Sequence, residues 1–314
     1  MDKNSYTPLR YRYPLKKKVP SHKKWTNILI IVVLVLFLIS ASLGFLAAFI
    51  SRLTLLEMLL SLMPASGLIG STNIIVLGID DTAGVRRSDT MIIVHIDPEL
   101  QSAGVISIPR DTLVSIPTIG LDKINHAYAQ GGVELAQRTA SEFLQISIPY
   151  YIKIDLAGLV KIVDRLGGVT VNVEKRMYYT DQAGHFLVDL NPGVQKLSGR
   201  EALGYVRFRH DNLGDFGRIG RQQKFLKSLA DEMVHGGNIL QAPTLLSDLI
   251  SNVETNLNSR EILGLAISLR QAYETGKINM ISIPGTATMI DGVYYWRPDM
   301  AETQKIIERI FKRG

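Results

Sequence analysis

Arginines gather in one short stretch of the chain, VRFRHDNLGDFGRIGRQQ, at residues 206–223. The stretch has no lysine, and its four arginines are Arg207, Arg209, Arg218 and Arg221. A guanidinium grips a phosphate group through two parallel hydrogen bonds, whereas a lysine acts as a point charge. Glycines among the arginines allow the chain to bend back. The composition of this stretch therefore predicts a site for phosphate groups.

Helices decide where these side chains point. We predict a helix that begins near Arg218, which would place Arg218, Arg221 and Gln222 on one face of its first turn. The free N–H groups and the positive dipole end of a helix N-terminus also favour anions. Upstream, an extended exit from a preceding helix would point Arg207 and Arg209 the same way.

An ion-pair network is the alternative interpretation, since Asp211 and Asp215 lie between the arginines. Such a network on a solvated face would need no ligand. Four arginines against two aspartates, beside a glycine-rich loop at a helix start, favour the anion site.

A second cluster is GIDDTAGVRRSDT, at residues 78–90. Asp80 follows a predicted strand and Asp89 opens the next, so the two carboxylates are expected at neighbouring strand ends. Oxygen ligands of this kind suit a hard cation such as Mg²⁺. A hairpin with turn-forming aspartates is the alternative.

Arg110 follows a predicted strand and Pro109, which places it at an end of the sheet. Ligands of open α/β sheets collect outside the carboxyl ends of the strands. A local ion pair between Arg110 and Asp111 is the simpler interpretation, but three clusters at strand ends or helix starts together favour a binding site.

The elements that must position these clusters alternate along the chain. Short β-branched runs predict strands at 73–80, 90–97, 104–109, 150–155, 169–174 and 278–285, and a hairpin at 288–296. Helical spacing predicts helices at 123–132, 133–145, 156–168, 197–208, 218–234 and 299–313. This order predicts an α/β fold, with a mixed central β-sheet and helices on both faces.

Charge and hydropathy divide the chain before this domain. The net charge is +6, but residues 1–27 alone carry +7, which leaves −1 for the rest. Residues 28–50 are 23 uncharged, mostly apolar residues, and as a helix they would span ~34 Å, enough for a hydrocarbon core of roughly 30 Å. We predict a cytoplasmic basic tail (1–27), a transmembrane anchor helix (28–50), a connector (51–71) and an extracytoplasmic domain (72–314). The chain has no cysteine, which excludes disulfides and thiolate sites.

Several motifs occur in a familiar order. They are Arg-Ser-Asp-Thr-Met, Ser-Ile-Pro-Arg-Asp, Lys-Ile-Asn-His-Ala-Tyr, Gly-Gly-Val and Arg-x-Arg…Gly-Asp-Phe-Gly-Arg-x-x-Arg-Gln-Gln. With the basic tail and the anchor, this order resembles the LytR-CpsA-Psr family over about residues 72–314. Members of that family are membrane-anchored phosphotransferases. They move a glycopolymer from a polyprenyl pyrophosphate carrier to cell-wall peptidoglycan and form a phosphodiester.

The resemblance also implies roles for single residues. The expected pyrophosphate ligands are Arg87, Arg110, Arg207, Arg209, Arg218, Arg221 and Gln222. Asp80 and Asp89 are expected to bind Mg²⁺, with Mn²⁺ as the alternative, and the expected catalytic residues are Asp215, Arg218 and Arg110. The bridging P–O bond of a pyrophosphate breaks more easily when arginines and a cation neutralise the negative charge that develops as it breaks. Asp215 would orient the attacking hydroxyl or accept its proton, although a carboxylate of ordinary pKa near ~3.9 is a weak base.

Other functions remain open at this level. A module that binds lipid pyrophosphate and regulates the envelope without turnover needs only the arginines, and a pyrophosphatase would use water in place of the wall hydroxyl. A nucleic-acid regulator is disfavoured, because the outer domain is nearly neutral and its basic residues are not interleaved with aromatic ones. The apolar residues at 150–173 and 229–234 are expected in the core, and the resemblance implies that some of them line a lipid tunnel.

Overall fold

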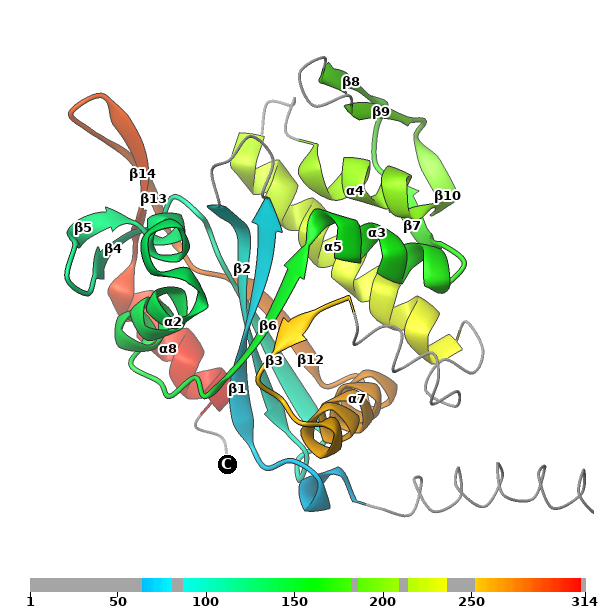
Figure 1. Cartoon of the computed structure of the whole chain (residues 1–314), viewed down its shortest axis with the longest axis horizontal. Coiled ribbons are helices and arrows are strands. Elements are labelled where there is room, and N and C mark those ends of the chain that lie inside the picture. The colour runs from blue at the N-terminus through cyan, green and yellow to red at the C-terminus, as the bar shows by residue number, and fades with distance from the viewer. Residues whose placement is uncertain (1–63, 81–86, 182–185, 209–213, 236–251, 312–314) are drawn as a thin grey trace, which may run out of the picture. The chain divides into compact units, whose positions relative to one another are not determined.

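The computed structural model describes residues 64–80, 87–181, 186–208, 214–235 and 252–311 (Figure 1). Residues 63–314 form one compact unit. The predicted tail and anchor lie outside the described residues, as does the connector before residue 64. None of the helices within the described ranges has the length and apolar character needed to cross a membrane.

A mixed β-sheet runs through the middle of this unit. Its strands lie in the order β11-β6-β1-β2-β3-β12. Their bounds are β1 Thr72–Asp80, β2 Arg87–Asp97, β3 Ser102–Ile108, β6 Tyr150–Asp155, β11 Glu254–Thr255 and β12 Ile278–Ser282. The strands β6, β1, β3 and β12 are parallel to one another, and β2 and β11 are antiparallel to their neighbours. The carboxyl ends of the four parallel strands therefore share one edge of the sheet.

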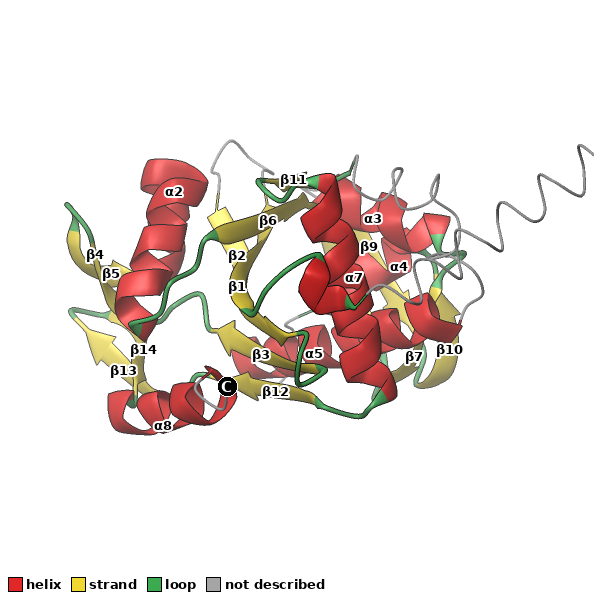
Figure 2. Cartoon of the chain, turned by 90° about the horizontal axis from the view of Figure 1, so that it is seen from below, coloured by secondary structure: helices red, strands yellow, loops and turns green. Residues whose placement is uncertain are grey.

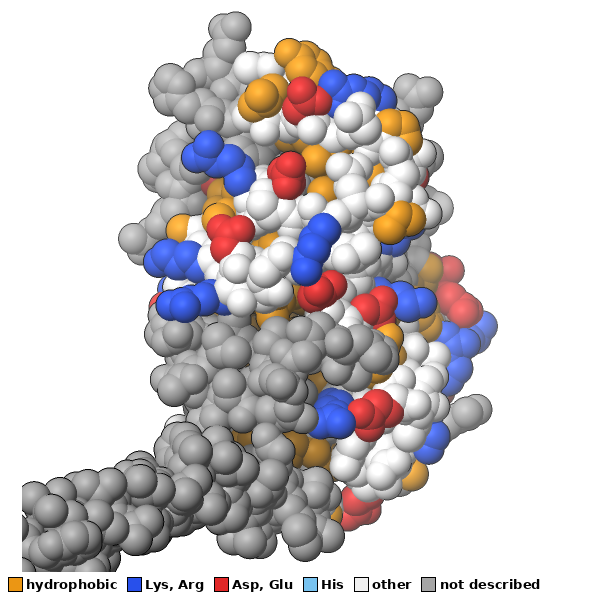
Figure 3. Space-filling model, turned by 90° about the vertical axis from the view of Figure 1, so that its right-hand side faces the viewer, with side chains coloured by type: hydrophobic (Ala, Val, Ile, Leu, Met, Phe, Trp, Pro, Cys, Tyr) orange, Lys and Arg blue, Asp and Glu red, His pale blue; other side chains and the backbone are white. Residues whose placement is uncertain are grey.

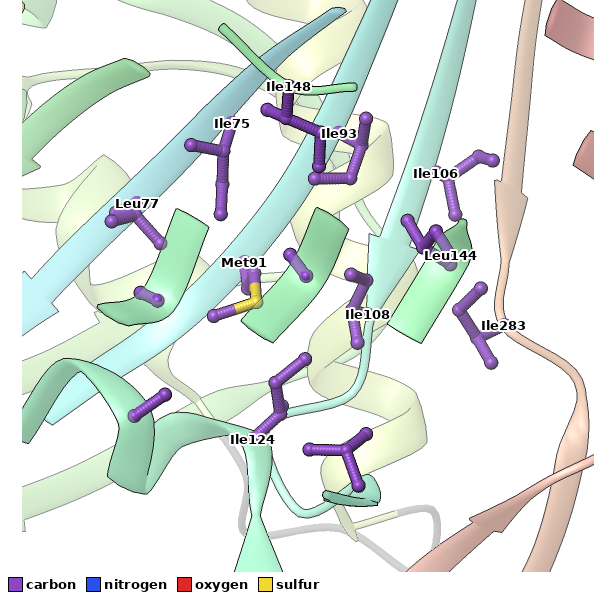
Figure 4. Close-up of a cluster of buried hydrophobic side chains, with 14 of the residues drawn as sticks. Ile75, Leu77, Met91, Ile93, Ile106, Ile108, Ile124, Leu144, Ile148 and Ile283 are labelled. Carbon is purple, nitrogen blue, oxygen red and sulfur yellow. The ribbon is translucent and has the colours of Figure 1, made fainter. Parts of the chain in front are cut away.

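One face of the sheet packs on helices α2 (Ile124–Leu144) and α8 (Met300–Phe311). Alternate strand residues point to this face, so that Ile75, Leu77 and Ile93 are fully buried. Figure 4 shows these side chains with Leu144 of α2 in the same cluster. This is the main hydrophobic core.

Helices α5 (Gly214–His235) and α7 (Ser259–Glu274) cover the opposite face (Figure 2). Leu265 of α7 packs there against Ile74 and Ile96. Gln223 of α5 donates to the Ser107 hydroxyl of β3 over 3.2 Å. The predicted mixed sheet with helices on both faces is therefore confirmed.

A second core lies between α3 (Leu156–Arg165), α4 (Gly199–Arg207) and short antiparallel strand pairs. These strands are β7 Val169–Val173, β8 Met177–Asp181, β9 Phe186–Leu190 and β10 Gly193–Leu197. A capping box begins α4, where Glu201 accepts from the Ser198 backbone N–H over 2.8 Å. The sequence predicts β7 as a strand at 169–174. It does not predict β8, β9 or β10.

Two further hairpins complete the described chain. They are β4 Leu113–Ile116 with β5 Gly120–Lys123, and β13 Gly285–Ile290 with β14 Val293–Pro298. The second was predicted from the sequence. The sequence predicts two helices that meet between residues 132 and 133, and the structure has an interruption of α2 at Gly131 and Gly132. Gly132 has a φ of 62°, which other residues seldom adopt.

Charged side chains of both signs are mixed on the face that Figure 3 shows. Lysine and arginine side chains lie among aspartates and glutamates over the described part of this face. The described part of this face therefore carries mixed charge, unlike the basic stripe by which proteins contact nucleic-acid backbones.

A glycine sets the distance between α3 and α4. A Cβ at Gly199 would lie 2.2 Å from the Val160 carbonyl oxygen, which is backbone and cannot move alone. We expect Gly199→Ala to lower the free energy of unfolding by about 1–3 kcal/mol. Thermal unfolding of the full chain in detergent, followed by circular dichroism, measures this. The control is Gly220→Ala in α5, where a Cβ would meet nothing within 4 Å. A Gly199→Ala protein that unfolds at the wild-type temperature would contradict the tight contact.

Candidate functional site

Two carboxylates stand at the paired ends of β1 and β2. Asp80 is the last residue of β1 and lies opposite Arg87, the first residue of β2. The register then pairs Ile79 with Ser88 but Gly78 with Thr90, so Asp89 is an extra residue in a β-bulge. A bulge bends its strand and re-aims the side chain it carries. The predicted placement of Asp80 and Asp89 at neighbouring strand ends is confirmed.

Each carboxylate is paired with an arginine that is distant in sequence. Asp80 Oδ2 lies 2.8 Å from an Nη of Arg207, the last residue of α4. Asp89 Oδ1 lies 2.7 Å from an Nη of Arg110, which follows β3. These four side chains are between 14% and 33% exposed, so solvent and ligands can reach them. The structure therefore brings the clusters around residues 80, 89, 110 and 207 to one edge of the sheet.

Arg110 is part of a longer row of alternating charges. Its Nε lies 3.6 Å from Asp111 Oδ2, and Asp111 Oδ1 lies 2.8 Å from Lys123 Nζ. Lys123 also lies 5.5 Å from the centre of the Tyr295 ring. The local pair of Arg110 and Asp111 is therefore real, but it is one link of the row and exists together with the pair to Asp89.

Helix α5 presents two of the predicted ligands to the same strands. Gln222 donates to the Thr90 hydroxyl of β2 over 3.0 Å, which fixes the direction of this helix face. Arg218 lies one turn earlier on that face and is only 4% exposed. The Arg218 side chain is therefore largely desolvated, and a charge in such surroundings attracts an anion more strongly than it does in water.

Two local details of the prediction are wrong. Helix α5 begins at Gly214, so Arg218 lies in its second turn and not at the N-terminus, where the free N–H groups are. Arg207 is the last residue of α4 and not part of an extended exit, whereas Phe208 after it is extended (φ −59°, ψ 127°) and buried. The arginines therefore act as side chains on helices, without the help of a helix N-terminus at Arg218.

Arg221 is more deeply buried than Arg110 and Arg207. It is 2% exposed, and one Nη lies 3.4 Å from Glu174 Oε1. Its other Nη donates to the Phe208 carbonyl, and the guanidinium carbon lies 5.4 Å from the centre of the Phe208 ring. The sequence does not single out Glu174, because a lone glutamate after a strand belongs to no motif.

Electrostatics keep the Glu174 carboxyl ionised. Burial alone would raise its pKa, but hydrogen bonds from its own N–H and from Tyr205, the charge of Lys224 and the hydrogen bond from Arg221 lower that pKa below its ordinary value. Burial raises the pKa of the Tyr205 hydroxyl, and Glu174 raises it further. Tyr205 therefore stays a neutral donor to a charged carboxylate at neutral pH.

Some predicted site residues cannot be placed fully. Arg209 lies outside the described residues. Arg87 and Asp215 are placed by their backbone alone, in β2 and in the first turn of α5. The structure adds Thr90 and Lys123 to the site. Both belong to motifs noted in the sequence, but nothing in the sequence shows that they contact Gln222 and Asp111.

Several apolar side chains on the α5 and α7 side of the sheet are only partly buried within the described part of the chain. Val76 and Val94 keep intermediate exposure although they belong to central strands. Apolar residues of the covering elements are only partly buried as well, among them Leu229, Met233, Ile262 and Leu269. These partly buried apolar side chains lie on the same side of the sheet as Gln222 and Gln223 of α5.

Comparisons with known proteins identify relatives of this chain. The model of the LytR_cpsA_psr family matches residues 66–312. The chain is 33% identical over 244 residues to the polyisoprenyl-teichoic acid–peptidoglycan teichoic acid transferase TagU of Enterococcus faecalis, and the match covers 76% of this chain and 78% of that protein.

Solved structures with the same architecture include TagV of B. subtilis. It has a TM-score of 0.68 and 31% identity, over 78% of this chain and 98% of that one. The structure titled TagT bound to LIIa-WTA has a TM-score of 0.67 and 28% identity, over 80% of this chain and 93% of that one. The resemblance in the sequence motifs is thus confirmed: this chain belongs to the LytR-CpsA-Psr family and is a transferase of that type.

Proposed function

We propose that this chain is a membrane-anchored phosphotransferase of the cell envelope. It would move a glycopolymer from a polyprenyl pyrophosphate carrier to peptidoglycan, or to a similar envelope acceptor, and form a phosphodiester. The observation that carries the proposal is the meeting of Arg110 and Arg207 with two carboxylates at the ends of β1 and β2. The relative TagU, a teichoic acid transferase, and the structure of TagT bound to LIIa-WTA indicate the class of substrate.

The arginines divide the work of holding the pyrophosphate. Arg110 contacts Asp89 and Arg207 contacts Asp80, and Arg218 and Gln222 belong to α5. Arg87 and Arg209 join them in the proposal because they match the family motif. Guanidinium groups from separate elements fix both the charge and the orientation of a diphosphate.

Asp80 and Asp89 fit a Mg²⁺ ion, or Mn²⁺ in its place. They are oxygen donors on adjacent strands, and Mg²⁺ is usually held by one or two carboxylates together with substrate phosphates. A bound Mg²⁺ supplies positive charge next to the phosphate oxygens. The carboxylates would then serve the cation, and their two arginines would be released toward the phosphates.

The transfer step follows from these positions. The oxygen of an acceptor hydroxyl forms a bond to the phosphorus nearest the glycan, and the bond from that phosphorus to the bridging oxygen breaks. Polyprenyl phosphate leaves with the bridging oxygen and one more negative charge, which Arg110, Arg207 and Arg218 stabilise. The hydroxyl proton goes to the Asp215 carboxylate, which lies one turn before Arg218 on α5.

The lipid and the anchor complete the proposal. The partly buried apolar side chains between the sheet and helices α5 and α7 would hold the polyprenyl chain beside its own phosphate. Residues 28–50 would anchor the chain in the cell membrane, with residues 1–27 cytoplasmic and the catalytic domain extracytoplasmic.

A direct test is transfer by the full chain in detergent. It is incubated with a short-chain polyprenyl-pyrophosphate-linked saccharide, wall fragments and Mg²⁺, and the products are identified by mass spectrometry. We expect a glycan–wall phosphodiester, and we expect it to disappear with Arg218→Ala and with a chelator. Free sugar phosphate without linkage would favour a pyrophosphatase, and binding without any turnover would favour a regulatory module.

A further inference from the structure

Both Nη atoms of Arg221 have partners inside the protein. Its guanidinium pairs with Glu174 and donates to the Phe208 carbonyl, and its side chain is 2% exposed against 33% for Arg207. A phosphate group could reach Arg221 only after these contacts were broken. Its place in the fold therefore indicates a task different from that of Arg207.

The Phe208 carbonyl belongs to the end of α4. The last carbonyl groups of a helix have no partner within the helix, and here the Arg221 side chain supplies one. The Phe208 ring stacks on the same guanidinium. Arg207, which pairs with Asp80, is the residue immediately before Phe208. Arg221 therefore holds the backbone at the C-terminal end of α4, next to Arg207.

Glu174 connects this contact to the rest of the second core. It follows β7, and it accepts from the Tyr205 hydroxyl of α4 over 3.1 Å and from Arg221 of α5. Lys224 of α5 lies 3.7 Å from its Oε2. One ionised carboxylate thus joins a strand and two helices, and both helices carry proposed pyrophosphate ligands.

We propose that Glu174 and Arg221 are a positioning pair, which aims Arg207 at the pyrophosphate through Phe208 and does not touch the phosphates. This inference rests on the proposed function. It assigns Glu174 a role that no motif suggests, and it moves Arg221 from the phosphate ligands to their support. The guanidinium fork suits this task because it reaches a carboxylate and a carbonyl at once.

Binding of inorganic pyrophosphate with Mg²⁺ to the full chain, measured by calorimetry, separates the two roles of Arg221. A positioning pair predicts that Glu174→Gln and Arg221→Gln each weaken binding by about 5- to 20-fold, and that the double variant is little worse than either single one. A phosphate-binding Arg221 predicts the opposite for Glu174→Gln, because the guanidinium loses its competing carboxylate. Glu174→Gln preserves the shape of the side chain, so it keeps the test valid if Arg221→Gln fails to fold.

The Arg207→Gln background tests the route of the effect. If Arg221 acts through Arg207, Arg221→Gln should weaken binding by less than about twofold more in that background. The control is Arg176→Gln, which breaks the exposed pair between Arg176 and Asp189 in the same core and should leave binding unchanged. Unchanged or tighter binding by Glu174→Gln, or an Arg221→Gln effect that persists without Arg207, would overturn the positioning role. Wild-type protein that binds no pyrophosphate would overturn the proposed function as well.

Discussion

Arg110→Ala should lower the rate of glycopolymer transfer by about 10²–10³-fold, the loss measured when one preorganised donor is removed from the site of developing charge. Arg110 is the arginine that lies between Asp89 and Asp111 at the end of β3. Its removal deletes a proposed phosphate ligand and leaves Asp89 without this partner. An uncompensated carboxylate would also repel the phosphates. Single-turnover transfer with saturating lipid-linked substrate measures the loss.

Two variants show whether this loss is specific. Arg138→Ala removes an arginine that is 62% exposed and pairs with Glu142 on α2, and it should transfer at the wild-type rate. Arg110→Lys keeps the charge without the two-pronged grip, so its rate should fall between those of wild type and Arg110→Ala. A loss of less than tenfold in Arg110→Ala, with an unchanged unfolding temperature, would remove Arg110 from the pyrophosphate grip.

The sequence predicts the elements of this fold well, because burial imposes a simple period on them. The continuous apolar run at residues 74–77 predicts a buried strand, and the structure buries Ile74 and Ile75 of β1 in different clusters. The pair Gly131-Gly132 marks the break in α2 for a local steric reason. Signals of this kind depend only on near neighbours in the chain.

The start of α5 shows where local signals fail. The sequence Gly-Asp-Phe-Gly was interpreted as a loop, since each glycine inside a helix costs about 1 kcal/mol. Tertiary packing outweighs this cost, because Ile219 and Phe225 of the same helix are buried. The acidic Asp215 in the first turn also stabilises the helix, because a negative charge interacts favourably with the positive end of the helix dipole.

The candidate site was only half predictable for a related reason. Its residue types and strand-end positions are visible in the sequence, but its contacts join residues far apart, such as Asp80 with Arg207 and Gln222 with Thr90. The bulge at Asp89 depends on the pairing register of two strands, which no single strand encodes. The role of Glu174 depends on contacts with Tyr205 and Arg221, which form only in the folded second core.

The double variant Asp80→Asn, Asp89→Asn should lower transfer by about 10³-fold and abolish its response to Mg²⁺, because a metal at a phosphoryl centre contributes several kcal/mol at ~1.4 kcal/mol per tenfold. Each amide keeps the shape of the carboxylate but loses its charge. A titration of transfer rate with Mg²⁺ measures the response. The control is Asp189→Asn, which removes a carboxylate that is 49% exposed and paired with Arg176.

A second measurement is the affinity of the double variant for pyrophosphate. The ion pairs of Asp80 with Arg207 and of Asp89 with Arg110 predict whether this affinity rises or falls. Without metal, Asp80 and Asp89 compete with phosphate for these two arginines, so the double variant should bind pyrophosphate at least as tightly as wild type in the presence of a chelator. With Mg²⁺ present, wild type should gain affinity and the double variant should not, because only the carboxylates link the cation to the site. If the double variant keeps the wild-type Mg²⁺ response, the cation binds elsewhere, and Asp80 and Asp89 serve only to hold the arginines in place.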